Sequence, residues 1–405
     1  MKDILRSLKS IWKLILLLLL TALAFCYAMF QGGFVSWFLF YAFLPFAVYS
    51  ILLAVYPLQT FRAARTLSKD QFSAGEILKG EITLERPFPF PLIYIIAEEC
   101  LPSGLKQTAA DQPARKLFIL GFRRKAVFTY TVQSMKRGEH HFSRIRIKTG
   151  DLLGLFEKEV TMKTDKTILV YPTAFSMGYR HSKPQYEQGA SASSQRYIKD
   201  TTMASGIREY QPGDRMAWID WKATAKRDSF MTKEFEQTRT HDAMLIMDQQ
   251  ASDSFEPMIT FTASLAKAII KTGAPLGFIL LGTELDTTPV QPGEKQLQTI
   301  FRKLARVNPE PSSASFSIWE ERMASQGGYR SSNLFIVSVL TMELVRKLEH
   351  RASYSDLKLY FIRKKNQLLT QEEEVLLDRL NKRGIAAEAV SEGFFDQALE
   401  EVKSL

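Results

Sequence analysis

The chain has little cysteine and none of the familiar catalytic motifs. Only Cys26 and Cys100 occur among 405 residues, which excludes a disulfide scaffold and a thiolate metal cluster. The sequence has no Gly-rich phosphate loop, no GxGxxG, no GxSxG and no HExxH. Of the five histidines only His140 and His141 are neighbours, and in a strand they would point to opposite faces. These absences favour a protein that is not an enzyme.

Charge is also missing from one long stretch near the N-terminus. No charged side chain occurs in the 48 residues from Leu14 to Phe61. One helix crosses a hydrocarbon core with about 20 residues, so two crossings fit. Gln31-Gly32-Gly33 is a natural turn between the runs Leu14–Phe30 and Phe34–Leu58. Residues 1–61 are therefore predicted to form a transmembrane helical hairpin.

Basic residues flank this hairpin, whereas its turn has none. They are Lys2, Arg6, Lys9 and Lys13 before the first run, and Arg62, Arg65 and Lys69 after the second. Positive flanks stay in the cytoplasm, so both termini and the soluble domains are expected there, with the hairpin in the plasma membrane. A cleaved signal peptide is the alternative, although no small-x-small cleavage site leaves a sensible mature end.

Two kinds of periodicity divide the remaining chain. Alternating runs such as FSRIRIKTGD, GEITLE and AVFTYTV predict a β-sandwich over residues 62–175. A stretch rich in Ser, Gln and Gly predicts a linker over 176–205. From AMLIMD onward, apolar strands alternate with helical patterns, which is typical of βαβ units. Residues 206–405 are predicted to form an open α/β domain around a parallel sheet.

The net charge of +10 is concentrated in one β segment. Ten basic residues lie between Arg115 and Lys148, against Glu139 as the single acid. A solvated sheet face and a nucleic-acid surface are alternatives. Because the segment follows a membrane hairpin, we expect Arg123, Arg124 and Lys125 to meet anionic lipid, and we expect no nucleic-acid partner.

The stretch GIREYQPGDRMAWIDWKATAKRDSF, residues 206–230, is the most distinctive. Pro212-Gly213 predicts a turn that Asp214 holds through nearby backbone. If WIDW is a strand, Ile219 and Trp221 share one face, and Asp220 lies on the other and pairs with a base. A partner-docking surface is the second interpretation of the stretch, and acid/base chemistry by its two carboxylates is the third.

A family resemblance is carried by the same residues. R-E-Y-x-x-G-D followed by I-D-W-K-A-T-A-K, Arg208 to Lys226, resembles the hallmark of the domain of unknown function family fifty-eight. Members are bacterial membrane-anchored proteins whose C-terminal half is similar to a von Willebrand factor type A domain. TGDLLGLFEKE and ILVYP resemble that family as well. The partner-binding residues that we assign on this basis are Arg208, Tyr210, Gly213, Asp214, Asp220, Trp221 and Lys222. The family's arginine pair before I-D-W is replaced here by Ala217 and Trp218, with Arg215 nearby.

A type A domain implies a metal site after its first strand, with the pattern Asp-x-Ser-x-Ser. Here Asp248 and Ser252 match that pattern, but Gln250 replaces a serine. Thr341-Met342-Glu343 also lacks the aspartate expected later in the chain. Hard cations need several oxygen ligands, so we expect no cofactor, with Mg²⁺ or Mn²⁺ at Asp248 and Ser252 as the alternative.

The resemblance implies a non-enzymatic scaffold or assembly factor, because members are often encoded beside MoxR-type AAA+ ATPases. The expected protein presents its type A-like domain to such a cytoplasmic partner, and the motif braces that domain against the β-sandwich. One alternative is a metal-dependent binding protein or hydrolase that uses the degenerate site. Another is a structural component of an envelope complex that works without an ATPase.

Overall fold

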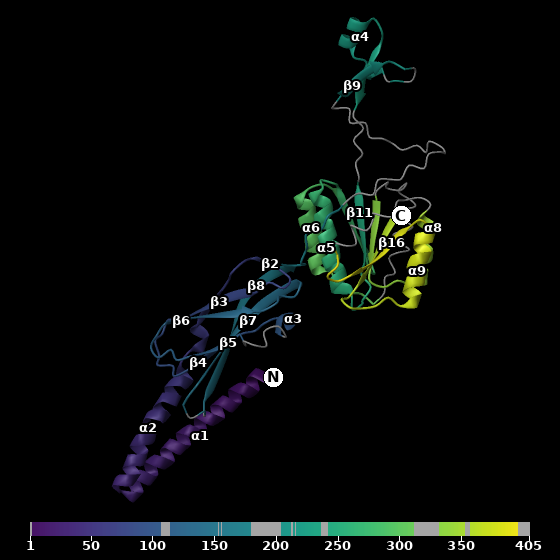
Figure 1. The fold of residues 1–405 in the computed structure, drawn as a ribbon. Coiled ribbons are helices and arrows are strands. Elements are labelled where there is room, and N and C mark those ends of the chain that lie inside the picture. Colours follow the sequence, from purple (N-terminus) through teal and green to yellow (C-terminus); the bar gives the residue numbers. More distant parts are fainter. Residues whose placement is uncertain are drawn as a thin grey trace. The chain divides into compact units, whose positions relative to one another are not determined.

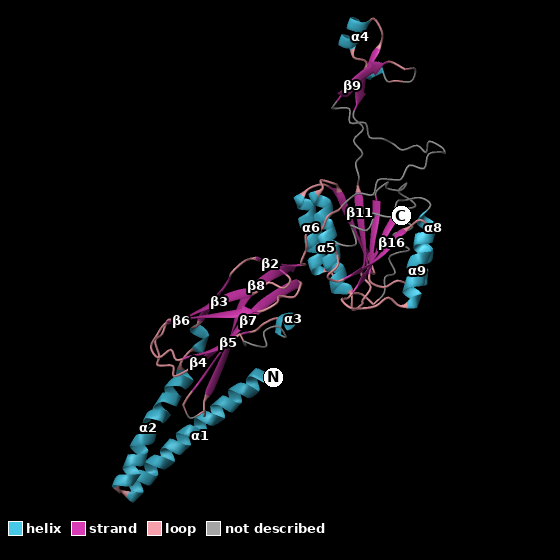
Figure 2. Cartoon of the chain, viewed as in Figure 1, coloured by secondary structure: helices cyan, strands magenta, loops and turns pink. Residues whose placement is uncertain are grey.

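The structure is a computed structural model with two compact units, Met1–Thr173 and Ala174–Leu405 (Figures 1 and 2). The described residues are 2–106, 114–152, 154, 156–179, 204–211, 214, 216–235, 242–311, 332–352 and 357–395. Each unit has its own hydrophobic core and is described by itself.

An apolar helical hairpin begins the first unit. Helix α1 covers Lys2–Gln31 and helix α2 covers Phe34–Val55. The predicted turn is present, and Gly32 adopts φ +61°, a left-handed conformation that suits glycine. Within the described residues, α2 is long and apolar enough to cross a membrane, and the apolar part of α1, Ile15–Gln31, is shorter.

Helix α2 is fastened to the β part of its unit near its C-terminal end. Ser50 Oγ donates to Asp151 Oδ2 at 2.8 Å, and Tyr56 Oη donates to the Phe88 carbonyl at 2.9 Å. Lys158 Nζ donates to the carbonyl oxygens of Ala54 and Tyr56. An ammonium group at a helix C-terminus is favoured by the helix dipole, while burial lowers the pKa of Lys158.

The β part contains two sheets that share one hydrophobic core. Its connections include the 3₁₀ turn η1, Leu58–Thr60, and the short helix α3, Ser103–Lys106. The first sheet is antiparallel, with the order β1 (Arg62–Leu67), β3 (Leu78–Glu85), β6 (Lys125–Val132). The second has the order β2 (Gln71–Ser73), β8 (Glu157–Tyr171), β7 (Gly138–Gly150), β4 (Ile95–Glu99), β5 (Arg115–Phe118), and only β2 pairs parallel. Alternate residues of β3 and β6 are buried, as their period-two sequences predict.

A buried ion pair lies inside this part of the unit. Arg65 binds Glu99 through two bonds, Nη2–Oε1 at 2.7 Å and Nε–Oε2 at 3.1 Å, and it also donates to the Phe142 carbonyl. Burial raises the pKa of Glu99, and the Arg65 guanidinium opposes that rise. Arg65, expected from the sequence to be a cytoplasmic flank of the hairpin, therefore has a structural partner.

The second unit is built on a six-stranded mixed sheet. The strand order is β13 (Leu285–Gln291), β12 (Leu276–Leu281), β11 (Ala243–Asp248), β14 (Ser332–Val337), β15 (Leu357–Arg363), β16 (Ala386–Ser391). Five strands are parallel, as the alternation of apolar strands and helices predicts. The prediction of a parallel sheet is wrong for the edge strand β13, because this strand runs antiparallel to β12. The loop of residues 282–284 is too short for a parallel crossover.

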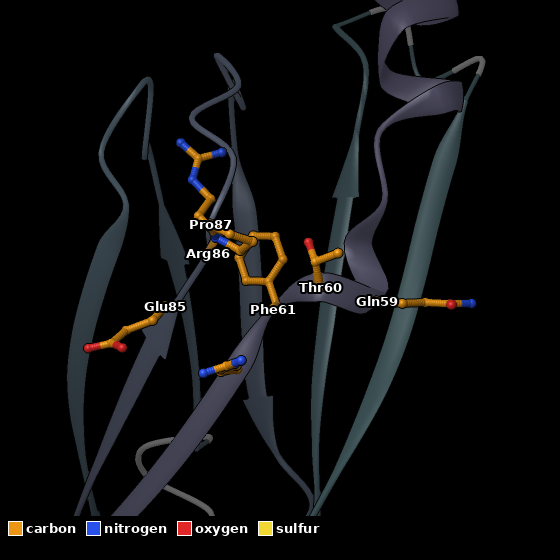
Figure 3. A pocket seen from close by; sticks show the side chains of 7 residues that line it. Gln59, Thr60, Phe61, Glu85, Arg86 and Pro87 are labelled. Carbon is orange, nitrogen blue, oxygen red and sulfur yellow. The ribbon is translucent and has the colours of Figure 1, made fainter.

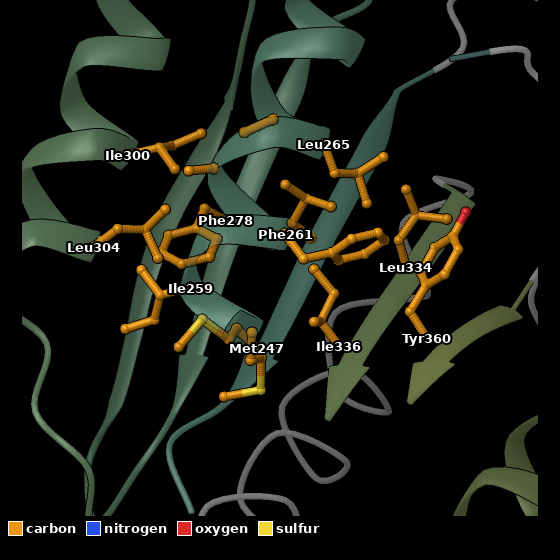
Figure 4. Packing of buried hydrophobic residues seen from close by; sticks show 14 of the residues in the cluster. Met247, Ile259, Phe261, Leu265, Phe278, Ile300, Leu304, Leu334, Ile336 and Tyr360 are labelled. Atoms are coloured by element: carbon orange, nitrogen blue, oxygen red, sulfur yellow. The ribbon is translucent and has the colours of Figure 1, made fainter. Parts of the chain in front are cut away.

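Helices cover both faces of this sheet. Helices α5 (Phe255–Lys271) and α6 (Glu294–Arg306) lie on one face, and α8 (Met342–Ala352) and α9 (Gln371–Lys382) lie on the other (Figure 1). In the core beneath α5 and α6, the rings of Phe261 and Tyr360 are in contact, and Phe278 belongs to the same cluster (Figure 4). Strands that are apolar throughout are therefore explained by burial from both sides.

The predicted linker over residues 176–205 begins inside the second unit. Met177 is buried in its core, and the Phe175 amide donates to Ser264 Oγ at 2.9 Å. Residues 180–203 lie outside the described part of the chain.

Candidate functional site

The distinctive stretch folds as a two-stranded hairpin with helical turns between its strands. Strand β9 (Ala204–Glu209) pairs antiparallel with β10 (Met231–Phe235). Between them lie the 3₁₀ turn η2 (Met216–Trp218) and helix α4 (Trp221–Arg227). We call residues 204–235 the motif hairpin. Residues 212, 213 and 215 are not described, so the predicted partner-binding residue Gly213 and the arginine at 215 lie outside the described residues.

Asp214 organises the turn that follows β9. Its Oδ1 accepts from Arg208 Nη2 at 2.7 Å, and its Oδ2 accepts from the Gln211 amide at 3.0 Å. The second bond is the contact to turn backbone that the sequence predicts. Two charged residues of the motif therefore serve its own fold, since each oxygen of Asp214 has a local donor.

Asp220 caps helix α4. Its Oδ1 accepts from the Ala223 amide at 3.0 Å, which satisfies a backbone donor at the helix start. The interpretation of WIDW as a strand is therefore wrong, because Ile219 forms a single bridge with Thr232 and Trp221 is already helical. The expected pairing of Asp220 with a base is also replaced, by this bond to backbone. An aspartate before helix-forming residues prefers the cap position to a strand.

The apolar side chains of the motif hairpin divide into two groups. Ile219 and Met231 are buried. Met216, Trp221 and Phe230 are exposed by 73%, 67% and 59%. Tyr210 packs its ring edge-on against Phe230 at a centroid distance of 6.5 Å, and Lys222 is exposed on α4. The hairpin thus offers large apolar side chains beside positive charge.

A second group of polar residues lies at the carboxyl ends of β11 and β14. Asp248 ends β11, is buried, and accepts from the Gln250 amide at 3.2 Å. Ser252 Oγ donates to Ser338 Oγ at 2.7 Å, and Ser338 directly follows β14. Sequence reasoning missed Ser338, although carboxyl ends of neighbouring parallel strands meet at one sheet edge.

Other positions of the type A pattern are used for helix capping or filled by side chains. Thr341 Oγ1 accepts from the Leu344 amide at 3.3 Å at the start of α8. Gly282, which directly follows β12, is closely approached by two side chains. A Cβ atom at this position would lie 1.8 Å from Gln249 Oε1 and 2.8 Å from Glu310 Oε2, so these side chains fill the space beside the glycine. Among the described residues, no group of three or more His, Cys, Asp or Glu could hold a metal. The edge therefore combines the Asp248 and Glu310 carboxylates with hydroxyl and amide groups.

The predicted membrane-surface residues lie at the start of β6. The buried Arg86 side chain holds this segment by donating to the carbonyls of Gly121 and Arg123, at 2.6 and 2.8 Å. Arg123 and Arg124 are exposed, and Lys125 pairs with Glu85 at 3.4 Å.

A pocket of about 570 Å³ lies beside the buried Arg86, between the turn after α2 and the end of β3 (Figure 3). Its lining residues are Gln59, Thr60, Phe61, Arg62, Glu85, Arg86 and Pro87. Basic and apolar groups therefore meet at this end of the β part.

Comparison with known proteins places the chain in a family. The family model described as "Protein of unknown function DUF58" matches residues 206–381. The "Uncharacterized protein YeaD" of Bacillus subtilis (strain 168) is 39% identical over 375 residues, which are 92% of this chain and 94% of that protein. The chain belongs to the DUF58 family. The DUF58 match begins in β9 and ends in α9, so it includes all but the first two residues of the motif hairpin.

Solved structures add little to this assignment. The match to the bacterial hydrophobin BslA covers 25% of this chain and 96% of the BslA chain, with 11% identity and a TM-score of 0.16. The match to Spo0M, a sporulation control protein from Bacillus subtilis, covers 27% of this chain and 49% of the Spo0M chain, with 14% identity and a TM-score of 0.14. Likenesses this slight assign neither a fold nor an activity to the DUF58 chain.

Proposed function

We propose that this DUF58 protein is a membrane-anchored, non-enzymatic scaffold or assembly factor. Helices α1 and α2 anchor it in the plasma membrane, with both termini and the folded units in the cytoplasm. In this proposal the two-sheet β part is a β-sandwich, and the six-stranded sheet is a type A-like domain. That domain and the motif hairpin are presented to a protein partner.

The exposed apolar side chains of the motif hairpin are the observation that carries this proposal. Its charged residues Arg208, Asp214 and Asp220 bind within the hairpin, whereas Trp221 and Phe230 are exposed. Large exposed apolar groups are typical of binding surfaces, and tryptophan is enriched among residues that dominate binding energy. This arrangement supports partner docking better than catalysis.

A MoxR-type AAA+ ATPase is the partner that the family resemblance implies. The test is co-purification of this ATPase with the full-length protein from membranes in mild detergent. Trp221→Ala is expected to abolish co-purification, because it removes the largest exposed ring of the hairpin. Phe394→Ala is the matched control, since Phe394 is an exposed aromatic outside the motif hairpin.

Each result of this experiment has a defined meaning. Retention of the ATPase by Trp221→Ala contradicts docking through the hairpin. Recovery of other envelope proteins from membranes without the ATPase supports a structural component of an envelope complex instead.

A divalent-ion site is the second candidate function, favoured by the juxtaposition of polar groups at the sheet edge. Asp248 is buried there, and Ser252 contacts Ser338. Mg²⁺ and Mn²⁺ prefer such oxygen ligands, although carboxylates usually supply more of them. Binding of either ion with micromolar affinity would favour a metal-dependent binding protein or hydrolase.

A further inference from the structure

The β part packs against one face of the last two turns of helix α2, while Leu52 and Val55 remain exposed. The Tyr49 hydroxyl accepts from the Ile93 amide at 3.3 Å, and Leu53 is buried in the core of the β part. Only the stretch from Phe34 to residue 48 precedes this contact, and at 1.5 Å per residue it spans about 22 Å. A hydrocarbon core is about 30 Å thick. If α2 crosses the bilayer, the hydrocarbon therefore extends about 8 Å further, to the level of Leu53, which lies between Tyr49 and Tyr56.

Two loops of the β part lie at this same level. Phe88, in the loop after β3, is joined to Tyr56 by the hydrogen bond from the tyrosine hydroxyl to its carbonyl. The loop before β6 is held to it, because Gly121 pairs with Leu92 and the Arg86 side chain binds both loops. The first loop therefore contacts the end of α2, and the second loop is held to the first.

The tips of these loops are apolar and exposed. Phe88, Ile119 and Phe122 have exposed fractions of 57%, 79% and 69%. Fully burying a side chain of this size contributes about 1.5 to 3 kcal/mol, so exposure of three to water is unfavourable. A lipid environment at this level accounts for all three.

Positive charge directly follows the apolar tips. Arg123 and Arg124 are exposed, and neither forms an ion pair with any residue that the structure describes. Basic side chains near an anionic membrane surface gain about 1 kcal/mol each. Apolar tips followed by unpaired arginines match the acyl chains and headgroups of an anionic leaflet.

We propose that this end of the β part is inserted into the cytoplasmic leaflet. We call Phe88, Ile119, Phe122, Arg123 and Arg124 the lipid rim. Its apolar side chains enter the acyl region around α2, and its arginines bind anionic headgroups. The inference rests on the proposed membrane anchor and extends it, because the β part then completes a span that α2 makes only in part.

The test uses the full-length protein in vesicles of phosphatidylcholine and phosphatidylglycerol. Single cysteines at positions 88, 119 and 122, in a background with Cys26→Ala and Cys100→Ala, carry a nitrobenzoxadiazole label. Ile77→Cys is the matched control, because Ile77 is exposed at the opposite end of β3. Leu39→Cys, on an exposed position of α2, reports on the anchor itself.

We expect labels on the rim to emit at shorter wavelength, to be quenched by spin-labelled lipid and to resist iodide. The label at 77 should show the reverse. Iodide quenching at all three rim positions, with position 39 still protected, would overturn rim insertion and leave the anchor in place. Iodide quenching at position 39 would overturn the anchor.

The arginines are tested with the label at position 122. Removing phosphatidylglycerol is expected to increase iodide quenching there, and Arg123→Gln with Arg124→Gln should abolish this lipid dependence. Equal quenching in vesicles with and without phosphatidylglycerol would overturn the headgroup role of the arginines.

Discussion

The DUF58 match includes five strands of the six-stranded sheet and nearly all of the motif hairpin, and these two regions differ in how they bury apolar residues. Strands β11 and β12 are buried along their whole length, with a hydrophobic core on each face. The hairpin buries Ile219 and Met231 and exposes Trp221 and Phe230. A two-stranded hairpin is at best marginally stable in water. The comparison teaches that the sheet is stabilised by its own core, whereas the hairpin relies on local hydrogen bonds and a few buried side chains.

The strongest test of this contrast is truncation of the sheet core. Phe278→Ala removes a fully buried ring and is expected to cost about 3 to 5 kcal/mol. Urea unfolding of the full-length protein measures this loss, with hydrogen exchange of the β11 and β12 amides as the probe of unfolding. Phe394→Ala is the control and should stay within about 0.5 kcal/mol of the wild type. Equal losses for both variants would contradict the assigned core.

Loss of the α4 cap should have a smaller and local effect. Asp220→Ala removes the acceptor of the Ala223 amide, which typically costs about 1 kcal/mol. Hydrogen exchange of the Ala223 amide should accelerate about fivefold, while the β11 amides keep their rates. Asp220→Asn retains a capping acceptor and should resemble the wild type. If the asparagine variant exchanges like the alanine variant, charge rather than capping is the contribution of Asp220.

Replacement of the exposed tryptophan should hardly change stability. Trp221→Ala is expected to alter unfolding by no more than about 0.5 kcal/mol, because the ring makes few contacts within the hairpin. The same variant should fail to retain the ATPase. A large loss of stability, measured by hydrogen exchange of the β9 and β10 amides, would instead make Trp221 part of the hairpin's own packing.

The smallest expected effect is that of divalent cations. Isothermal titration of the full-length protein in detergent with Mg²⁺ or Mn²⁺ should give no micromolar binding. The reason is that no group of three or more His, Cys, Asp or Glu side chains gathers at this edge among the described residues. Asp248→Ala serves as the blank. Ion binding by the wild type that disappears in this variant would show that Asp248 at the sheet edge binds the ion.

Strong periodicity made much of the fold predictable. AMLIMD, LGFILLG and NLFIVSVL are apolar on both faces, and each contains a strand of the predicted sheet. Strand β13 was not predictable by the same signal, because LDTTPVQ is polar and contains Pro289. Its only clue is the short loop at Gly282. The small strands β1 and β2 likewise lack a run of fully buried residues.

The candidate site was predictable only where a residue acts on its near neighbours in sequence. Asp214 and its turn follow from local backbone chemistry, and the cap at Asp220 could have been found from the helix formers that follow it. WIDW was misinterpreted because four residues fit a period of two as well as a helix start. The contact between Ser252 and Ser338 joins positions 86 residues apart, so it required the sheet order.

Helix α2 is hydrogen-bonded to the β part at several points along its length. Tyr49, Ser50 and Tyr56 each bond to the β part through their side chains, and Lys158 of β8 binds a carbonyl at the end of the helix. A domain on a flexible tether would swivel freely above its anchor. Here the bonds fix the angle between the helix and the sheets. If α2 crosses a bilayer as proposed, a thinner bilayer that tilts α2 must also turn the β part, and membrane thickness would then set the orientation of that domain.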